Sequence, residues 1–162
     1  MNAPEVISLI VFLVICLAAG AMGGLVTGPA VKTWYPTLQK PSWNPPSWLF
    51  APVWTVLYVL MAIAAWLVWR AGLFFGTPGI LFGLQLILNM LWSWFFFGKH
   101  RPDQSFAEIL VLWVSILATA VAFVQVNLVA GWLFVPYLLW VTFAAVLNGT
   151  IWRMNPELGR AG

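Results

Sequence analysis

The sequence predicts an all-α integral membrane protein whose single domain, residues 1–162, is a bundle of five transmembrane helices. Hydrophobic residues make up 63% of the chain and charged residues only 7%, whereas a soluble domain carries about 25% charged residues. Five apolar stretches each reach the roughly 20 residues that a helix needs to cross the hydrocarbon core. They take up most of the chain, which leaves no room for a separate soluble domain.

The first apolar stretch is followed by a loop in which prolines alternate with aromatic residues. We expect spans over residues 5–26, 47–70, 78–97, 105–126 and 131–153, with the Pro/Trp-rich loop over 27–46. Proline fixes φ and removes a backbone donor, so this loop should be stiff and folded rather than helical. Tryptophan favours the level where membrane meets water. The loop is therefore either a lid or pocket wall, or an interfacial anchor that binds no ligand.

Short sequence signals mark where three of the later spans begin. Ser47 is a plausible N-cap for the second span, and Thr77-Pro78 places proline at the first helical position of the third. Ser105 and Glu108 have the spacing of a capping box, which would give Glu108 a structural role at the start of the fourth span.

The fifth span follows a very short connection, residues 127–131, so it should lie antiparallel to the fourth. Pro136 should bend this span or mark its effective start, because proline interrupts the hydrogen-bond ladder of a helix. Asn155-Pro156 should end it.

The third span carries two distinct faces. Gln85, Asn89 and Ser93 follow one another at i+4 spacing and share a face that should point toward protein or a cavity. Gly79 and Gly83 form a GxxxG pair about 200° away from Gln85. We therefore expect a homodimer through these glycines, or else their close packing inside one bundle. The polar face is either a ligand contact or a source of interhelical hydrogen bonds.

The positive charges predict how the bundle is oriented. Arg70 is the only Lys or Arg on the side that holds the N-terminus. By the positive-inside rule the opposite side is cytoplasmic, so the N-terminus lies outside and the C-terminus inside. That opposite side holds the other six, namely Lys32, Lys40, Lys99, Arg101, Arg153 and Arg160.

The composition excludes several kinds of chemistry. One cysteine, Cys16, and one histidine, His100, cannot form a disulfide, a metal site or a bis-histidine haem. All four acidic residues fall at span ends or in loops, so hydrolytic catalysis and proton-coupled transport lack their usual groups. No basic run suggests nucleic-acid binding. The interior left over is aromatic, apolar and amide-bearing, which suits a flat hydrophobic ligand and needs no cofactor.

Three stretches of the sequence resemble the TspO/translocator protein family, also called tryptophan-rich sensory proteins or peripheral benzodiazepine receptors. These are WYPTLQKPSWNPPSWLFAPVWTVLY, LQLILNMLWSWFFFG and FVPYLLWVTFAAVLNGTIWR, and their order and spacing match over nearly the whole chain. The resemblance implies a five-helix bundle, commonly a homodimer in membrane lipid. It also implies binding of porphyrins such as protoporphyrin IX and, in some members, of benzodiazepine-type drugs or cholesterol.

The resemblance implies a ligand pocket drawn from the loop and from the second, third and fifth spans. Trp54 and Trp140 would be the electron donors if the family's reported light-dependent porphyrin breakdown is an enzymatic reaction. For Trp140 the alternative is packing against lipid. The implied pocket residues are Tyr35, Trp43, Pro45, Trp54, Tyr58, Gln85, Asn89, Ser93, Trp140, Ala144 and Asn148.

One position departs from the pattern of the cholesterol-binding members. Those carry an aromatic between Leu147 and Arg153, where this chain has Gly149, so the sequence argues against sterol binding. Three functions stay open: a tetrapyrrole sensor or regulator, a light-dependent porphyrin-degrading enzyme, and a porphyrin transporter. The transporter has the least support, since the chain lacks coupling groups and an inverted repeat.

Overall fold

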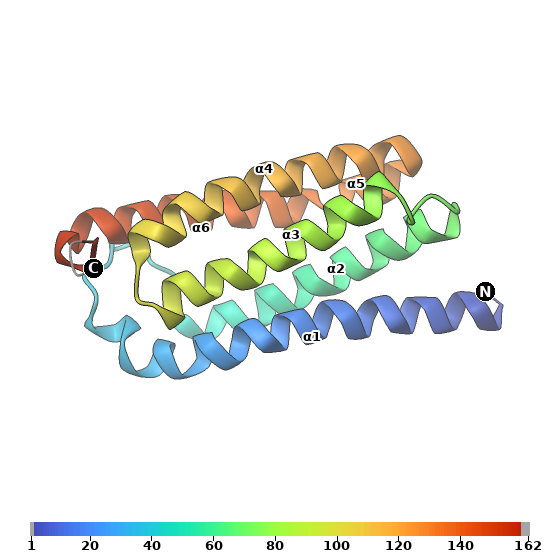
Figure 1. The fold of residues 1–162 in the computed structure, drawn as a ribbon. Helices are drawn as coiled ribbons and strands as arrows, with labels where there is room; N and C mark the ends of the chain where they lie inside the picture. The colour runs from blue at the N-terminus through green and yellow to red at the C-terminus, as the bar shows by residue number, and fades with distance from the viewer. Residues whose placement is uncertain (1, 160–162) are drawn as a thin grey trace.

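The computed structural model describes residues 2–159 as an antiparallel bundle of long helices (Figure 1). Five helical segments are long and apolar enough to cross a membrane, and no strand occurs among the described residues, which confirms the predicted fold class. The helices are α1 (Ala3–Thr33), α2 (Phe50–Arg70), α3 (Thr77–Ser93), α4 (Pro102–Val126), α5 (Leu128–Trp132) and α6 (Val135–Met154).

Helix α1 is longer than predicted. It begins with a capping box in which Asn2 and Glu5 exchange side-chain to backbone hydrogen bonds, and it runs to Thr33 instead of ending near Val26. Pro29 lies inside the helix, where Thr33 Oγ1 donates to its carbonyl oxygen. Proline is tolerated in membrane helices, so it did not end this one. At 1.5 Å per residue, the 31 residues span about 46 Å.

Three of the other spans include short irregular turns. A 3₁₀ turn, Ser47–Leu49, leads into α2, and a π-helical turn, Trp94–Gly98, extends α3. The fifth span is broken into α5 and α6, and Pro136 occupies the first turn of α6 as expected of a start signal.

The predicted capping box of the fourth span is wrong. Helix α4 begins at Pro102, three residues earlier than Ser105, because proline at the first helical position needs no hydrogen-bond partner for its nitrogen. Ser105 therefore lies inside the helix, where its hydroxyl donates to Asn148 Oδ1 (2.9 Å). Both carboxyl oxygens of Glu108 are buried without a hydrogen-bond partner among the described residues. Glu108 is thus an interior residue and not a helix cap.

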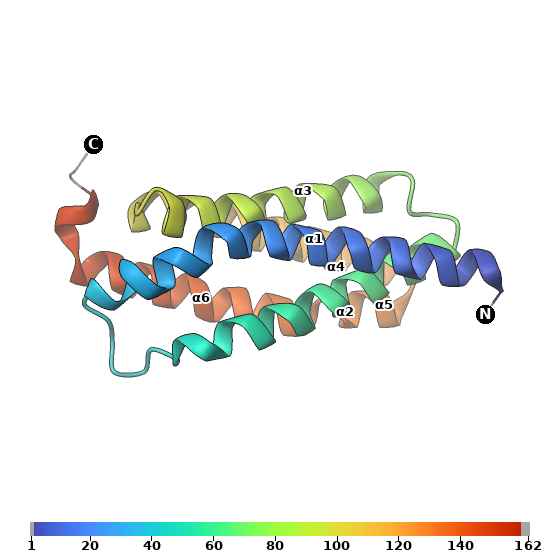
Figure 2. The same ribbon diagram turned by 90° about the horizontal axis from the view of Figure 1, so that it is seen from below.

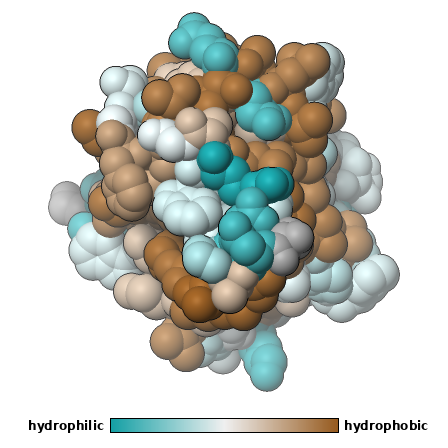
Figure 3. All heavy atoms as spheres, turned by 90° about the vertical axis from the view of Figure 1, so that its right-hand side faces the viewer, coloured by the Kyte–Doolittle hydropathy of each residue, from teal (hydrophilic) through white to brown (hydrophobic). Residues whose placement is uncertain are grey.

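Helices α1 and α2 are joined at the end of the bundle that holds the N-terminus. Arg70 forms an ion pair with Glu5 (3.0 Å), and Trp66 Nε1 donates to the Glu5 carbonyl (3.0 Å). Polar side chains gather on this end face within a surround of apolar ones (Figure 3). Farther along, a Cβ on Gly20 would lie 2.5 Å from the Tyr58 ring, so glycine permits the close approach of the two helices.

Candidate functional site

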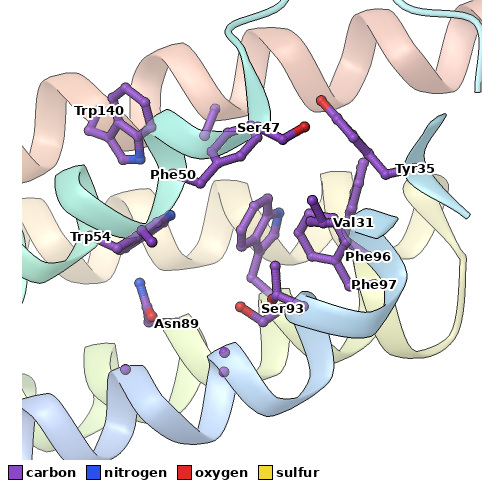
Figure 4. A pocket seen from close by; sticks show the side chains of 18 of the residues that line it. Val31, Tyr35, Ser47, Phe50, Trp54, Asn89, Ser93, Phe96, Phe97 and Trp140 are labelled. Atoms are coloured by element: carbon purple, nitrogen blue, oxygen red, sulfur yellow. The ribbon is translucent and has the colours of Figure 1, made fainter. Parts of the chain in front are cut away.

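A cavity of about 520 Å³ lies between α1, α2, α3 and α6, in the half of the bundle covered by the Pro/Trp-rich loop. Figure 4 shows side chains from these helices and from the loop around this one space. The lining is mainly aromatic and apolar, and its size falls in the range of small-molecule sites. Larger members of the lining are Tyr35, Phe50, Trp54, Tyr58, Trp92, Phe96, Phe97, Trp140 and Phe143.

Trp54 is central to the aromatic wall of this cavity. Its ring centroid lies 5.8 Å from that of Tyr58, 6.3 Å from Trp92 and 6.1 Å from Tyr137. These spacings are those of favourable ring pairs, which contribute about 0.5–1.5 kcal/mol each beyond the area buried. The Trp54 indole is therefore held in place before any ligand arrives.

Trp140 belongs to a second group of rings on the opposite wall. Its ring centroid lies 5.5 Å from that of Phe143 and 6.5 Å from that of Phe50. Trp140 lines the cavity, so its indole is available to a guest and not only to lipid.

The amide side chains of the cavity are already hydrogen-bonded within the protein. Tyr58 donates its hydroxyl hydrogen to Asn89 Oδ1, and Asn89 Nδ2 donates to the Tyr137 hydroxyl (2.8 Å). Asn148 Oδ1 accepts from Trp92 Nε1 (3.1 Å). These amides hold α2, α3 and α6 in register, so a ligand that bonds to one of them must share or displace an internal partner.

The structure brings most of the sequence-predicted site residues to this cavity. Tyr35, Trp54, Tyr58, Asn89, Ser93, Trp140, Ala144 and Asn148 line it. Three others do not. Gln85 is fully buried with its Nε2 against Met61 Sδ (3.8 Å), Trp43 is half-exposed beside Phe143, and Pro45 accepts a hydrogen bond from Asn44 in the loop.

Sequence reasoning missed the contribution of α1 and several aromatic residues. Trp92 and Phe143 each lie three residues after a predicted site residue, Asn89 and Trp140, and so share its helix face. That spacing was the signal that would have found them. On α1 the lining residues are mostly small, and they include Gly20, Ala21, Gly24 and Gly28.

Lys40 has a structural role in the loop. Its Nζ donates to the carbonyl oxygens of Tyr35 (2.7 Å) and Leu38 (2.9 Å), and it lies 5.0 Å from the centre of the Tyr35 ring. Lys32, by contrast, lines the cavity and has no ion pair among the described residues. The cation available to a guest is therefore Lys32.

Further contacts fix the loop to its surroundings. Asn155 Oδ1 accepts from the Gln39 amide (3.0 Å), and Asn155 Nδ2 donates to the Gln39 carbonyl (2.9 Å). Tyr35 donates to Asn44 Oδ1, and burial raises the pKa of Tyr35 to about 12, so its hydroxyl stays a neutral donor. The loop is thus a folded cap over the cavity, tied to the end of α6.

The two glycines of the third span have different surroundings. A Cβ on Gly79 would lie 2.3 Å from the Phe74 carbonyl oxygen, so this glycine serves the turn before α3. A Cβ on Gly83 would meet no atom within 4 Å. Gly83 alone therefore offers open space to a second helix.

Five membrane-spanning helices around an aromatic cavity, closed at one end by a Pro/Trp-rich cap, define a small multi-pass membrane protein with a ligand-sized internal site. The chain belongs to the TspO/MBR family, whose model matches residues 12–153, as the sequence motifs indicated.

Curated relatives cover most of their own length and of this chain. The tryptophan-rich protein TspO of Chlorobaculum tepidum is 42% identical over 155 residues, which are 94% of this chain and 98% of the relative. Protein CrtK of Rhodobacter capsulatus is 42% identical over 151 residues (90% and 91%). The human translocator protein is 40% identical over 126 residues, or 75% of each chain.

Proposed function

We propose that this protein binds a porphyrin such as protoporphyrin IX in the cavity beneath the Pro/Trp-rich cap and acts in tetrapyrrole sensing or regulation. The observation that carries the proposal is the cavity itself, which offers indole faces on two walls within about 520 Å³. A flat conjugated ring system stacks well on such faces. Benzodiazepine-type drugs, which are also flat and apolar, are candidate competitors for the same space.

Charge supports one orientation of the guest. Protoporphyrin carries its acidic groups along one edge, and Lys32 is the charged residue of the lining. The acidic edge would face Lys32 and the cap, while the apolar rings lie deeper between Trp54 and Trp140. Lys40 takes no part in this arrangement, because carbonyl oxygens already surround its ammonium group.

The test is a titration of protoporphyrin IX into the protein in nanodiscs, with protein-free nanodiscs as the control for partitioning. We expect saturable quenching of tryptophan fluorescence at one porphyrin per chain. Quenching that rises linearly with porphyrin, as in the protein-free discs, would contradict the proposal.

A second candidate function is light-dependent oxidative breakdown of the bound porphyrin. It is favoured by one observation, that the indoles of Trp54 and Trp140 both line the cavity and can donate an electron to a photoexcited ring. Illuminating the complex in the presence of dioxygen and analysing the products separates the two candidates. An enzyme forms a defined new tetrapyrrole product over repeated turnovers, whereas a sensor returns its ligand unchanged.

We further propose that the cap and the C-terminus face the cytoplasm. Lys32, Lys40, Lys99, Arg101 and Arg153 all lie at the cap end of the bundle and Arg70 at the other, while Arg160 lies outside the described residues. A fluorescent protein fused to the C-terminus should fold and emit in bacterial cells, because the positive side stays inside. A periplasmic phosphatase fused at the same point should be inactive. The reverse pair of results would invert the assignment.

We also propose a homodimer through the Gly83 face of α3. Leucine at this open position would keep a second helix at a distance, so Gly83→Leu should weaken the dimer about tenfold in detergent while ligand affinity stays unchanged. Crosslinking at graded protein concentrations measures the change. Gly28→Leu, which also adds a side chain to open space but on α1, is the matched control. Equal dimerisation of the Gly83 variant and the parent would remove this face as the interface.

A further inference from the structure

The cavity is open to the outside of the bundle between α1 and α2. Ala21 and Gly24 of α1 and Ala51 and Thr55 of α2 all line the cavity, yet all four are exposed on the surface. A small residue can do both only where the cavity reaches the surface. The opening therefore lies in the side wall of the bundle and not in its capped end.

The two helices separate only along this half of their length. Contacts of Glu5 with Trp66 and Arg70 hold them together at the far end, and the Gly20–Tyr58 approach keeps them close at mid-height. Beyond Gly20 the separation grows, and Figure 2 shows the ribbons of α1 and α2 diverging toward the cap end. A Cβ on Gly24 or Gly28 would meet no atom within 4 Å, so no neighbouring side chain fills this space.

The surface around the opening is suited to lipid. Leu25 of α1 is 78% exposed and Val56 of α2 is 57% exposed, and both belong to membrane-spanning segments. Large exposed aliphatic residues in such segments face hydrocarbon. A molecule dissolved in the bilayer thus meets the opening directly.

A cation stands at the cap end of the same opening. Lys32 is exposed, lines the cavity, and follows Gly24 by eight residues on α1, about 12 Å along the helix axis. Moving an ionised acid through hydrocarbon is costly. A ligand that slides sideways can instead keep its acid groups at the interface, beside Lys32, while its apolar body passes between the helices.

We propose that the cavity is filled laterally from the bilayer through the opening between α1 and α2, and that its ligands are flat amphiphiles with acidic groups along one edge. This inference rests on the proposed function and adds the route and the ligand class. The cap is the competing route, but Lys40 and Asn155 hold it in place through hydrogen bonds to loop backbone atoms. A lateral route leaves these bonds intact during binding.

The test narrows the opening and measures binding rates by stopped flow in nanodiscs loaded with protoporphyrin IX. Ala21→Phe adds a ring at the opening, and Ala18→Phe adds the same ring one turn away, at an exposed position that does not line the cavity. We expect Ala21→Phe to slow association and dissociation by a similar factor, at least about tenfold, with Kd changed far less. Ala18→Phe should match the parent. Gly24→Leu, which enters open space, gives the same result if the ring at position 21 disturbs folding.

A second probe tests the ligand class. A porphyrin with ionised sulfonates on all four sides does not dissolve in the bilayer, so it should fail to reach the cavity of the parent protein. Parent-like rates in both Ala21→Phe and Gly24→Leu, faster binding in an Asn155→Ala variant with a loosened cap, or ready uptake of the tetrasulfonate would each overturn the lateral route. Saturable binding of protoporphyrin IX would survive those results, whereas its loss in the parent would end the proposed function and this inference together.

Discussion

Replacing Trp54 and Trp140 together by phenylalanine should remove most of the tryptophan quenching that bound porphyrin causes and weaken binding about tenfold. The two indoles line opposite walls of the cavity, so they are the donors nearest to a guest. Phenylalanine keeps an aromatic face but loses area on each wall, and ring contacts of this kind contribute about 0.5–1.5 kcal/mol each. If breakdown under light is enzymatic, the same variant should slow it sharply, because phenylalanine is a poorer electron donor than tryptophan.

The matched control replaces Trp48 and Trp132, which are 71% and 63% exposed and do not line the cavity. Fluorescence titration and illumination of this Trp48→Phe/Trp132→Phe protein should reproduce the parent apart from its lower starting fluorescence. Parent-like quenching, affinity and breakdown in the Trp54/Trp140 variant would show that the porphyrin binds elsewhere. Normal binding in the variant, combined with no new product from the illuminated parent, would exclude the enzyme and keep the sensor.

Asn89→Leu should destabilise the bundle by about 2 kcal/mol and also impair ligand binding. Asn89 is 2% exposed and links Tyr58 of α2 to Tyr137 of α6 by two hydrogen bonds. Interhelical hydrogen bonds in membranes contribute about 0.6 kcal/mol on average and up to about 1.7. Leucine removes both bonds and leaves two buried hydroxyls unpaired, which adds a desolvation cost.

Denaturation in mixed micelles with increasing dodecyl sulfate measures this loss of stability. Tyr58→Phe, which breaks only one of the two bonds, should cost about half as much. Ser93→Ala is the control from the same helix face, since the Ser93 hydroxyl lines the cavity without a hydrogen bond to the described residues. An Asn89→Leu protein as stable as the parent would mean that the amide contributes nothing to helix packing.

Hydropathy and start signals predicted the fold class because every membrane span must satisfy its own backbone. They failed at two places where local rules compete. Pro29 looks like a helix breaker, yet α1 continues past it to Thr33. Ser105 and Glu108 fit a capping box, but Pro102 begins the helix earlier and turns both side chains into the interior.

The candidate site was only partly readable for a related physical reason. Residues at i+4 share a helix face, which placed Asn89 and Ser93 correctly on the cavity wall. That face is wider than the cavity, so Gln85, one turn farther from the cap, packs against Met61 instead. The part played by α1 was hidden because glycine and alanine contribute space rather than chemistry, and a single sequence does not show which helices border that space.

The pairing of Asn155 with Gln39 sets different tolerances to sequence change at its two ends. Asn155 supplies both a donor and an acceptor from its side chain, but it contacts only the backbone amide and carbonyl of Gln39. Any residue other than proline can present those two backbone groups, so position 39 is free to drift. Position 155 is restricted to an amide of this reach, since aspartate would offer two acceptors and set a carboxylate against the Gln39 carbonyl.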